Sequence, residues 1–237
     1  MTTFYVLLLL VALLAGWYLI PFGLRKISFA RLGRYCREQK AIVLSYDDGP
    51  SSDLTPRLLD LLEEKETKAT FFLLGRNVEK RQEIIPRLVT TGHEIGSHTF
   101  DHTNAWKVWP WRAANDLAHG LRNLEAFCVQ TDMFRPPYGK STPAMLADCW
   151  RRKLRLGWWT IDSRDTWDRR PISDVTDEIE ARGGGVVLMH DLDISQAPDD
   201  GQSHADYVLE LTRNIIELAT IKGYKVQRLG DVYAEAV

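Results

Sequence analysis

The sequence predicts an α/β fold in which about seven parallel strands alternate with helices in a closed or nearly closed barrel. Two observations lead to this class. The predicted strands are short, almost continuously apolar runs, as expected for a parallel sheet that is covered on both faces. The segments between them repeat apolar residues at three- and four-residue spacing, which is typical of helices packed on such a sheet. With 237 residues and a net charge of −2, the chain can form one substantial domain and has no basic surplus for binding nucleic acid.

The N-terminal region differs from the rest of the chain. Residues 1–24 carry no charged side chain and residues 4–22 are nearly all apolar, which predicts a transmembrane helix before the barrel. No small-residue cleavage site follows, so a retained membrane anchor is predicted in preference to a cleaved signal peptide or a buried core helix. Residues 25–40 hold six positive side chains and a single acid, and are interpreted as a basic juxtamembrane linker. Residues 41–237 remain for the globular domain.

The charge distribution around the predicted span suggests an orientation. Positive residues flanking a span tend to stay in the cytoplasm, which favours a single-pass protein of a bacterial-type inner membrane whose domain faces the cytoplasm. The outward orientation stays open, because the rule often fails for single-span proteins. Cys36, Cys128 and Cys149 show neither disulfide nor zinc-site spacing. Unpaired thiols are more common in a reducing compartment.

Strands and helices alternate along the domain. Strands are expected near residues 41–44, 69–74, 93–97, 133–135, 156–161, 186–189 and 224–229, and helices near residues 54–62, 78–90, 111–127, 143–152, 175–181 and 208–218. Thr55-Pro56 suits the start of the first of these helices, because proline is tolerated in a first helical turn. In parallel (β/α) folds, the active site lies where the strands end.

Two adjacent acids, Asp47 and Asp48, follow the first predicted strand, which the next two residues, Gly-Pro, cannot continue. Adjacent residues leaving a strand point in different directions. One carboxylate can therefore bind a metal while the other faces the substrate as a base. Taken alone, the same residues would also fit an ordinary turn.

His98 and His102 strengthen the functional interpretation. Four residues apart, they would lie on one face of a helical turn, close enough to bind one divalent ion. With Asp48 they form a set of two histidines and one carboxylate that leaves coordination positions open, as in a catalytic metal site. Other polar residues at or just after predicted strand ends are Arg135, Asp162, Asp165 and His190. One mouth of the barrel is expected to collect all of them.

Five segments of the chain match, in order, the motifs of a known family. They are Ser45-Tyr46-Asp47-Asp48-Gly49-Pro50, His98-Thr99-Phe100-Asp101-His102, Arg135-Pro136-Pro137-Tyr138-Gly139, Asp162-Ser163-Arg164-Asp165-Thr166-Trp167 and Val187-Leu188-Met189-His190-Asp191. Over about residues 41–230 the chain thus resembles the polysaccharide deacetylase family, also called the nodulation-B homology domain or carbohydrate esterase family four, whose fold is a distorted (β/α) barrel with fewer than eight strands. Tyr46 departs from the usual phenylalanine, and Thr166 separates Asp165 from Trp167, which usually follows the acid directly.

The resemblance also implies a catalytic apparatus. It makes Asp47 the general base and gives Asp48, His98 and His102 a divalent metal, usually zinc, with cobalt as an alternative. An acetamide carbonyl is a poor electrophile, so this chemistry needs a metal to polarise it and to lower the pKa of the attacking water.

The remaining implied roles concern the oxyanion and the leaving group. Arg135 would orient the base, and the backbone N–H of Tyr138 would donate to the oxyanion. His190 would be the general acid, with a carboxylate partner that could be either Asp165 or Asp162.

The implied function is a metal-dependent hydrolase that removes the N-acetyl group from an N-acetylhexosamine unit of a polysaccharide, an oligosaccharide or a lipid-linked sugar. Its expected partners are this sugar and, through residues 4–22, a membrane, but not nucleic acid. A cytoplasmic domain would meet a lipid-linked or other membrane-proximal sugar. Two alternatives stay open: an amidohydrolase or deformylase of the same mechanism acting on another amide, and a catalytically inactive carbohydrate-binding relative.

Overall fold

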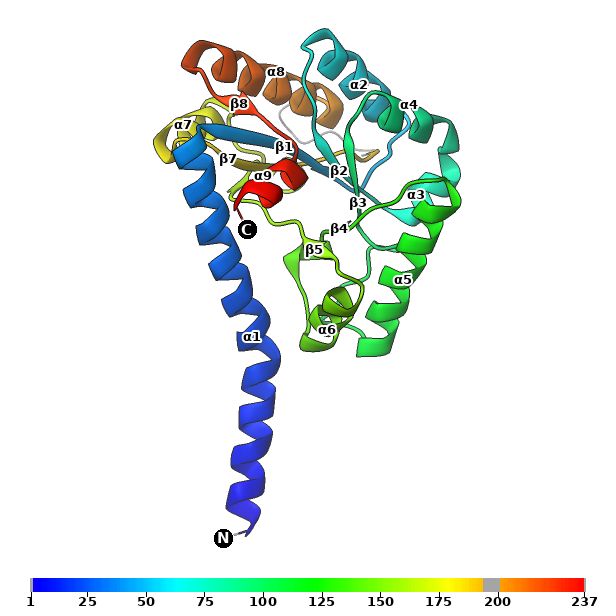
Figure 1. Ribbon diagram of the computed structural model, residues 1–237, viewed down its shortest axis with the longest axis vertical. Coiled ribbons are helices and arrows are strands. Elements are labelled where there is room, and N and C mark those ends of the chain that lie inside the picture. Colours follow the sequence, from blue (N-terminus) through cyan, green and yellow to red (C-terminus); the bar gives the residue numbers. More distant parts are fainter. Residues whose placement is uncertain (1, 194–200, 237) are drawn as a thin grey trace.

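The strand β1 (Ala41–Asp47) lies in the middle of a parallel sheet, between β2 (Thr70–Leu73) and β7 (Gly185–His190) (Figure 1). The computed structural model describes residues 2–193 and 201–236, apart from the side chains of residues 2, 3, 9, 10, 12–14 and 236. The other strands are β3 (Glu94–Ser97), β4 (Met133–Phe134), β5 (Arg155–Leu156), β6 (Ile161–Asp162) and β8 (Lys225–Val226).

The strands follow the order β5-β4-β3-β2-β1-β7-β6, β8 pairs with the start of β1, and every pair is parallel. The predicted parallel α/β class is therefore confirmed. The barrel is open, because β5 and β6 form the two edges of the strand path in the described part of the chain.

The single strand predicted for residues 156–161 is wrong. β5 pairs with β4 and β6 pairs with β7, so the intervening residues 157–160 cross from one edge of the sheet to the other. At the first crossing residue, Gly157, an added Cβ would overlap the ring of Phe72. A close approach of backbone to a core ring thus replaces regular pairing at this point.

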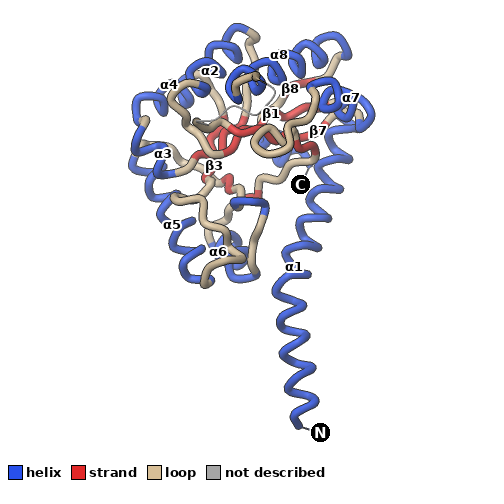
Figure 2. The backbone as a smooth tube through the Cα atoms, turned by 180° about the vertical axis from the view of Figure 1, so that it is seen from behind, coloured by secondary structure: helices blue, strands red, loops and turns tan. Residues whose placement is uncertain are grey.

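Helices cover the outer side of the sheet (Figure 2). They are α2 (Leu54–Glu64), α3 (Gly75–Lys80), α4 (Ile85–Thr90), α5 (Pro110–Ala126), α6 (Pro143–Arg151), α7 (Ile172–Arg182) and α8 (His204–Lys222). Two short 3-10 turns, η1 (Gln82–Ile84) and η2 (Pro137–Gly139), lie in the connections. The hydroxyls of Thr142 and Ser203 cap α6 and α8 by accepting hydrogen bonds from backbone N–H groups. Gly183 and Gly223 end α7 and α8 in the left-handed conformation that glycine adopts at least cost.

Both faces of β1 are buried, as expected for an inner parallel strand. Ile42, Leu44 and Tyr46 belong to the core shared with α2 and α8, whereas Ala41 and Val43 belong to a second core. To this second core α1 (Thr2–Gln39) contributes Leu32, Tyr35 and Cys36, and α9 (Leu229–Ala236) contributes Leu229 and Val232. The two helices therefore pack against the inner face of the half-barrel.

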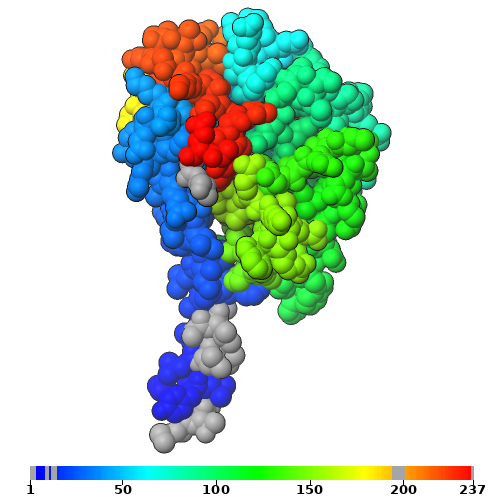
Figure 3. All heavy atoms as spheres, viewed as in Figure 1, coloured from blue at the N-terminus to red at the C-terminus, as the bar shows by residue number. Residues whose placement is uncertain are grey.

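α1 is a single helix that runs through both the predicted anchor and the predicted linker (Figure 1). Its C-terminal part packs on the domain, and its N-terminal part projects beyond it (Figure 3). In the part of α1 that the structure describes, no segment is long and apolar enough to cross a membrane. The transmembrane span predicted for residues 4–22 is thus not supported, and the linker is helical because its buried side chains pack on the sheet. The localisation inferred from the flanking charges stays a prediction.

Candidate active site and metal centre

The predicted site residues gather at the carboxyl ends of the strands. Asp47 is the last residue of β1 and pairs across the sheet with His190, the last residue of β7. His98 follows β3, and Arg135 follows β4 and donates its backbone N–H to the carbonyl of Ser97 at 3.0 Å. These groups lie together at the carboxyl ends of the strands, as predicted.

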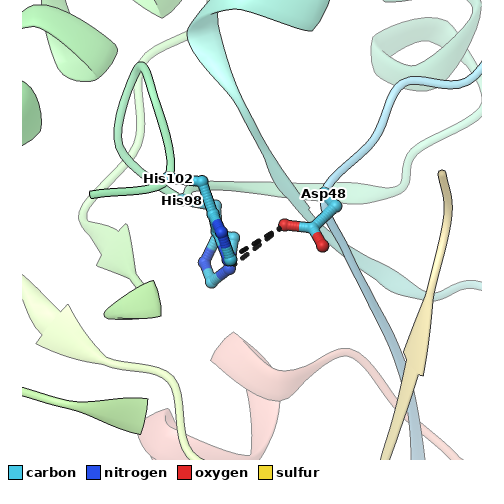
Figure 4. A group of neighbouring side chains, drawn as sticks. All are labelled: Asp48, His98 and His102. Carbon is cyan, nitrogen blue, oxygen red and sulfur yellow. Dashed lines mark ion pairs between the residues drawn. The ribbon is translucent and has the colours of Figure 1, made fainter. Parts of the chain in front are cut away.

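Asp48, His98 and His102 form a compact cluster of possible metal ligands (Figure 4). The Oδ1 atom of Asp48 lies 3.5 Å from Nε2 of His98 and 3.3 Å from Nε2 of His102. One ligand atom from each residue lies within 4.8 Å of the others. The same Oδ1 atom is buried and has no hydrogen-bond partner among the described residues. A buried carboxylate oxygen without a partner, next to two imidazole nitrogens, fits a divalent cation.

The imidazole of His98 is held in the form that binds metals. Its Nδ1 lies 2.7 Å from the carbonyl oxygen of Arg135, and this pairing requires a proton on Nδ1 and leaves Nε2 with its lone pair. Burial lowers the pKa of His98 to about 3, although the carboxylate of Asp48 acts in the opposite direction. His98 is therefore neutral, as a metal ligand must be.

The two histidines do not lie on a helical turn, and that prediction is wrong. Residues 98–102 form an irregular loop in which Thr99 and His102 have positive φ angles of 70° and 62°. The carboxylate of Asp116 on α5 holds the loop by accepting hydrogen bonds from the backbone N–H groups of Phe100, Asp101 and Thr103. Burial acts to raise the pKa of Asp116, but these hydrogen bonds outweigh it and the pKa is lowered. The sequence offers no sign of this long-range contact.

Asp47 and Arg135 form a buried ion pair beside the metal centre. Nη1 of Arg135 donates to Oδ1 of Asp47 at 2.7 Å, and both side chains are almost inaccessible to solvent. Arg135 also donates to the carbonyl of Gly157 at 2.9 Å and to the hydroxyl of Ser45 at 3.1 Å. Burial raises the pKa of Asp47, and the guanidinium of Arg135 opposes this rise. The pair gives Asp47 a fixed orientation with one oxygen, Oδ2, left toward the metal ligands.

The structure decides between the two candidate partners of His190. Nδ1 of His190 lies 2.7 Å from Oδ1 of Asp165, and the backbone N–H of His190 donates to the other oxygen of the same carboxylate. Asp162 instead accepts a hydrogen bond from the backbone N–H of Arg164. Burial acts to lower the pKa of His190, but the Asp165 carboxylate outweighs it and raises the pKa to about 9. His190 is thus an imidazolium at neutral pH.

Asp191 is a further buried acid, and the family motifs assigned it no role. Its two carboxylate oxygens accept hydrogen bonds from the hydroxyls of Ser51 and Thr55 at 2.7 and 2.6 Å, and its N–H donates to the carbonyl of Asp47. An added Cβ on Gly49 would meet this carboxylate at 2.5 Å. Asp191 therefore ties the loop after β1, which carries Asp48, to the end of β7.

Tyr138 lies in η2 at the edge of the metal cluster. Its ring centroid is 4.5 Å from that of His102, and its side chain is 57% exposed. The backbone of Tyr138 is in the left-handed region, with a φ of 59°, and Gly139 follows with a φ of 61°. Such a conformation is uncommon for a residue with a side chain and has to be held by its surroundings.

A half-barrel of parallel strands with a two-histidine, one-carboxylate cluster and adjoining acid–base pairs at the carboxyl ends of its strands is the arrangement expected of a hydrolase that uses a metal ion. The family model described as "Polysaccharide deacetylase" matches residues 34–154. The chain belongs to the polysaccharide deacetylase family.

Named relatives agree with this assignment. The chain is 31% identical over 205 residues to the peptidoglycan-N-acetylglucosamine deacetylase PgdA of Listeria monocytogenes, a match that covers 84% of this chain and 40% of the relative. A peptidoglycan-N-acetylglucosamine deacetylase of Bacillus cereus is 31% identical over 82% of this chain and 88% of its own. A chitooligosaccharide deacetylase of a Bradyrhizobium species is 33% identical over 64% of this chain and 71% of its own. The chain thus spans less than half the length of PgdA.

Solved structures show the same fold. The Bc1960 peptidoglycan N-acetylglucosamine deacetylase superposes with a TM-score of 0.73 at 29% identity, over 83% of this chain and 89% of the other. A pseudoenzyme of the family from Bacillus anthracis superposes with a TM-score of 0.67 at 23% identity, over 83% of this chain and 66% of the other. This second likeness concerns the fold alone.

Proposed function

We propose that the protein is a metal-dependent deacetylase that hydrolyses the acetamido group of an N-acetylhexosamine unit in a glycan or a lipid-linked sugar. The observation that carries the proposal is the Asp48, His98 and His102 cluster with a buried base, Asp47, on one side of it. Asp48, His98 and His102 would hold a divalent ion, with zinc best suited to this ligand set. Such an ion supplies Lewis-acid activation of the amide carbonyl and of the attacking water.

Asp47 acts as the general base. Its Oδ1 is occupied by Nη1 of Arg135, whereas its Oδ2 lies 3.7 Å from Nε2 of His98 and faces the metal centre. The Arg135 guanidinium opposes the rise in the pKa of Asp47 that burial causes, and it thereby favours the ionised carboxylate, the form that can accept a proton. Oδ2 is therefore the atom that takes the proton from the attacking water.

His190 acts as the general acid. Because Nδ1 is bonded to Asp165, Nε2 is the nitrogen that can give a proton to the departing amine. Asp165 keeps the imidazole protonated and fixes its orientation. The backbone N–H of Tyr138, in its left-handed turn beside His102, serves as the donor to the oxyanion.

The substrate class is supported by the relatives' names, one of which specifies N-acetylglucosamine in peptidoglycan and another chitooligosaccharides. The likeness to a pseudoenzyme shows that the fold alone does not guarantee activity. In this chain, however, the base, the acid and the three ligands are all present and arranged together.

The test is an activity screen of the purified full chain loaded with zinc. Chitooligosaccharides, peptidoglycan fragments and lipid-linked N-acetyl sugars are supplied separately, and free amine and acetate are both measured. Release of the two in equal amounts from at least one sugar, absent in the Asp47→Asn variant, is expected. Formate in place of acetate would support the deformylase alternative. Binding without any product would support the inactive carbohydrate-binding alternative.

A further inference from the structure

The Arg25 side chain of the N-terminal helix reaches the turn beside the active site. Residues before Arg34 lie outside the part of the chain that matches the family model. Nevertheless, Nη1 of Arg25 lies 3.4 Å from the carbonyl oxygen of Gly139, in the turn that carries Tyr138. The guanidinium also lies over the Trp159 ring, with its carbon 4.9 Å from the ring centroid. Arg25 is thus half-buried in the gap between the two edges of the half-barrel.

The turn that Arg25 contacts is closely packed, with no room for a side chain at Gly139. A Cβ added to Gly139 would lie 2.7 Å from the Trp159 ring and 3.1 Å from Nη1 of Arg25. Two consecutive residues of the turn, Tyr138 and Gly139, have left-handed backbones. For tyrosine this conformation is unfavourable, so its surroundings must hold it. Arg25 and Trp159 provide one side of that support.

A second line of contacts leads from Arg25 to the base. Two guanidinium groups lie near the Trp159 ring, because that of Arg135 is also over it, at 5.5 Å from the centroid. Arg135 in turn donates to Asp47 at 2.7 Å. Burial lowers the pKa of Arg25, but the charge of Asp162, at the other edge of the sheet, acts in the opposite direction. The contacts of the Arg25 guanidinium therefore lead through Trp159 and Arg135 to Asp47.

We propose that Arg25 is a positioning residue for catalysis: it clamps the Pro137–Gly139 turn against Trp159 and so sets the orientation of the Tyr138 peptide and of Arg135. This inference rests on the proposed function. It assigns the C-terminal part of α1 to the active-site wall of this chain. Arg25 touches no reacting atom, so its removal acts on turnover through the turn.

The kinetic test compares Arg25→Ala and Arg25→Lys with Lys26→Ala in the full, zinc-loaded chain. Lys26 is the matched control, because it is the next residue of α1 and is exposed, over the ring of Phe22. We expect Arg25→Ala to lower kcat by about tenfold with little change in KM or metal content, since oxyanion donors act only in the transition state. Arg25→Lys, which keeps the charge but not the planar fork, is expected to be intermediate. Lys26→Ala should behave as wild type, and methylguanidinium should partly restore Arg25→Ala.

A second readout does not require turnover. Hydrogen exchange of the backbone amides of Tyr138, Gly139 and Lys140 should be faster in Arg25→Ala than in wild type or Lys26→Ala, whereas exchange in β1 should be unchanged. Wild-type kcat in Arg25→Ala would overturn the inference, and so would a loss of kcat accompanied by metal loss and faster exchange throughout the domain. If wild-type protein releases no acetate from any sugar, the proposed function fails. The exchange of these three amides then decides the clamp by itself.

Discussion

Nδ1 of His190 lies 2.7 Å from Oδ1 of Asp165, a carboxylate that is 1% exposed. The same carboxylate accepts a hydrogen bond from the backbone N–H of His190. One acid therefore fixes both the His190 ring and the main chain where β7 ends. This arrangement keeps the imidazole charged and leaves Nε2 free toward the site. It also makes the pH dependence of the enzyme predictable.

The Asp165→Asn substitution should shift the alkaline limb of the pH profile of kcat/KM. A general acid is active below its pKa, and the pKa of His190 is raised to about 9. Wild-type kcat/KM should therefore fall as pH rises through about 9. Without the Asp165 carboxylate, burial lowers the pKa of His190 against only the weaker opposing effects of Asp47 and Asp48, so the limb should move to lower pH and kcat should fall by about tenfold or more.

The matched control is Asp162→Asn, because the Asp162 carboxylate accepts a hydrogen bond from the backbone N–H of Arg164 and not from His190. The measurement is a pH profile of kcat/KM for wild type and both variants. An alkaline limb that moves in Asp162→Asn and stays in place in Asp165→Asn would show that the partner has been assigned wrongly.

Asp47→Asn and Asp48→Asn should separate the base from the ligand. Asp47 is bonded to Arg135, so its amide variant should keep the metal and lose turnover by about a hundredfold or more. Asp48 has a buried oxygen free for the metal, so its variant should lose the metal itself. Metal content by mass spectrometry, measured beside kcat, checks both. If Asp47→Asn emptied the site, the two roles would have to be exchanged.

Asp191→Asn should remove a pH-dependent contribution to stability. Burial raises the pKa of Asp191 to about 6, above its ordinary value of 3.8. The folded state therefore binds more protons than the unfolded state between these values, and the contribution present below pH about 4 is lost as pH rises through about 6. The free energy of unfolding of wild type relative to Asp191→Asn should fall across this window. Urea unfolding at pH 4, 5, 6 and 7 measures it, and a constant difference would contradict the assignment.

Sequence patterns were sufficient for the parallel α/β class and for the groups at strand ends, because apolar runs and acids after them are local features. Local patterns could not show that residues 157–160 cross between the two edges of the sheet, since Gly157 lies against Phe72 from a distant strand. Nor could they show that Asp116, on α5, replaces a helical turn in shaping the histidine loop.

The N-terminal helix is another element whose long-range contacts local sequence patterns could not predict. Hydropathy drew attention to residues 4–22, but the feature that matters for the site is the packing of the following segment on the inner face of the half-barrel. Arg25 looked like one of several linker charges, because the distance from Arg25 to Gly139 along the chain hides their contact.

In the proposed mechanism, hydrolysis depends on a metal held by Asp48, His98 and His102. This dependence is tested by acetate release from an N-acetylated sugar by protein stripped with a chelator, before and after zinc or cobalt is added back. We expect no release from stripped protein, recovery with one equivalent of either metal, and no recovery in a folded His98→Ala variant. Full activity in rigorously metal-free protein would contradict it.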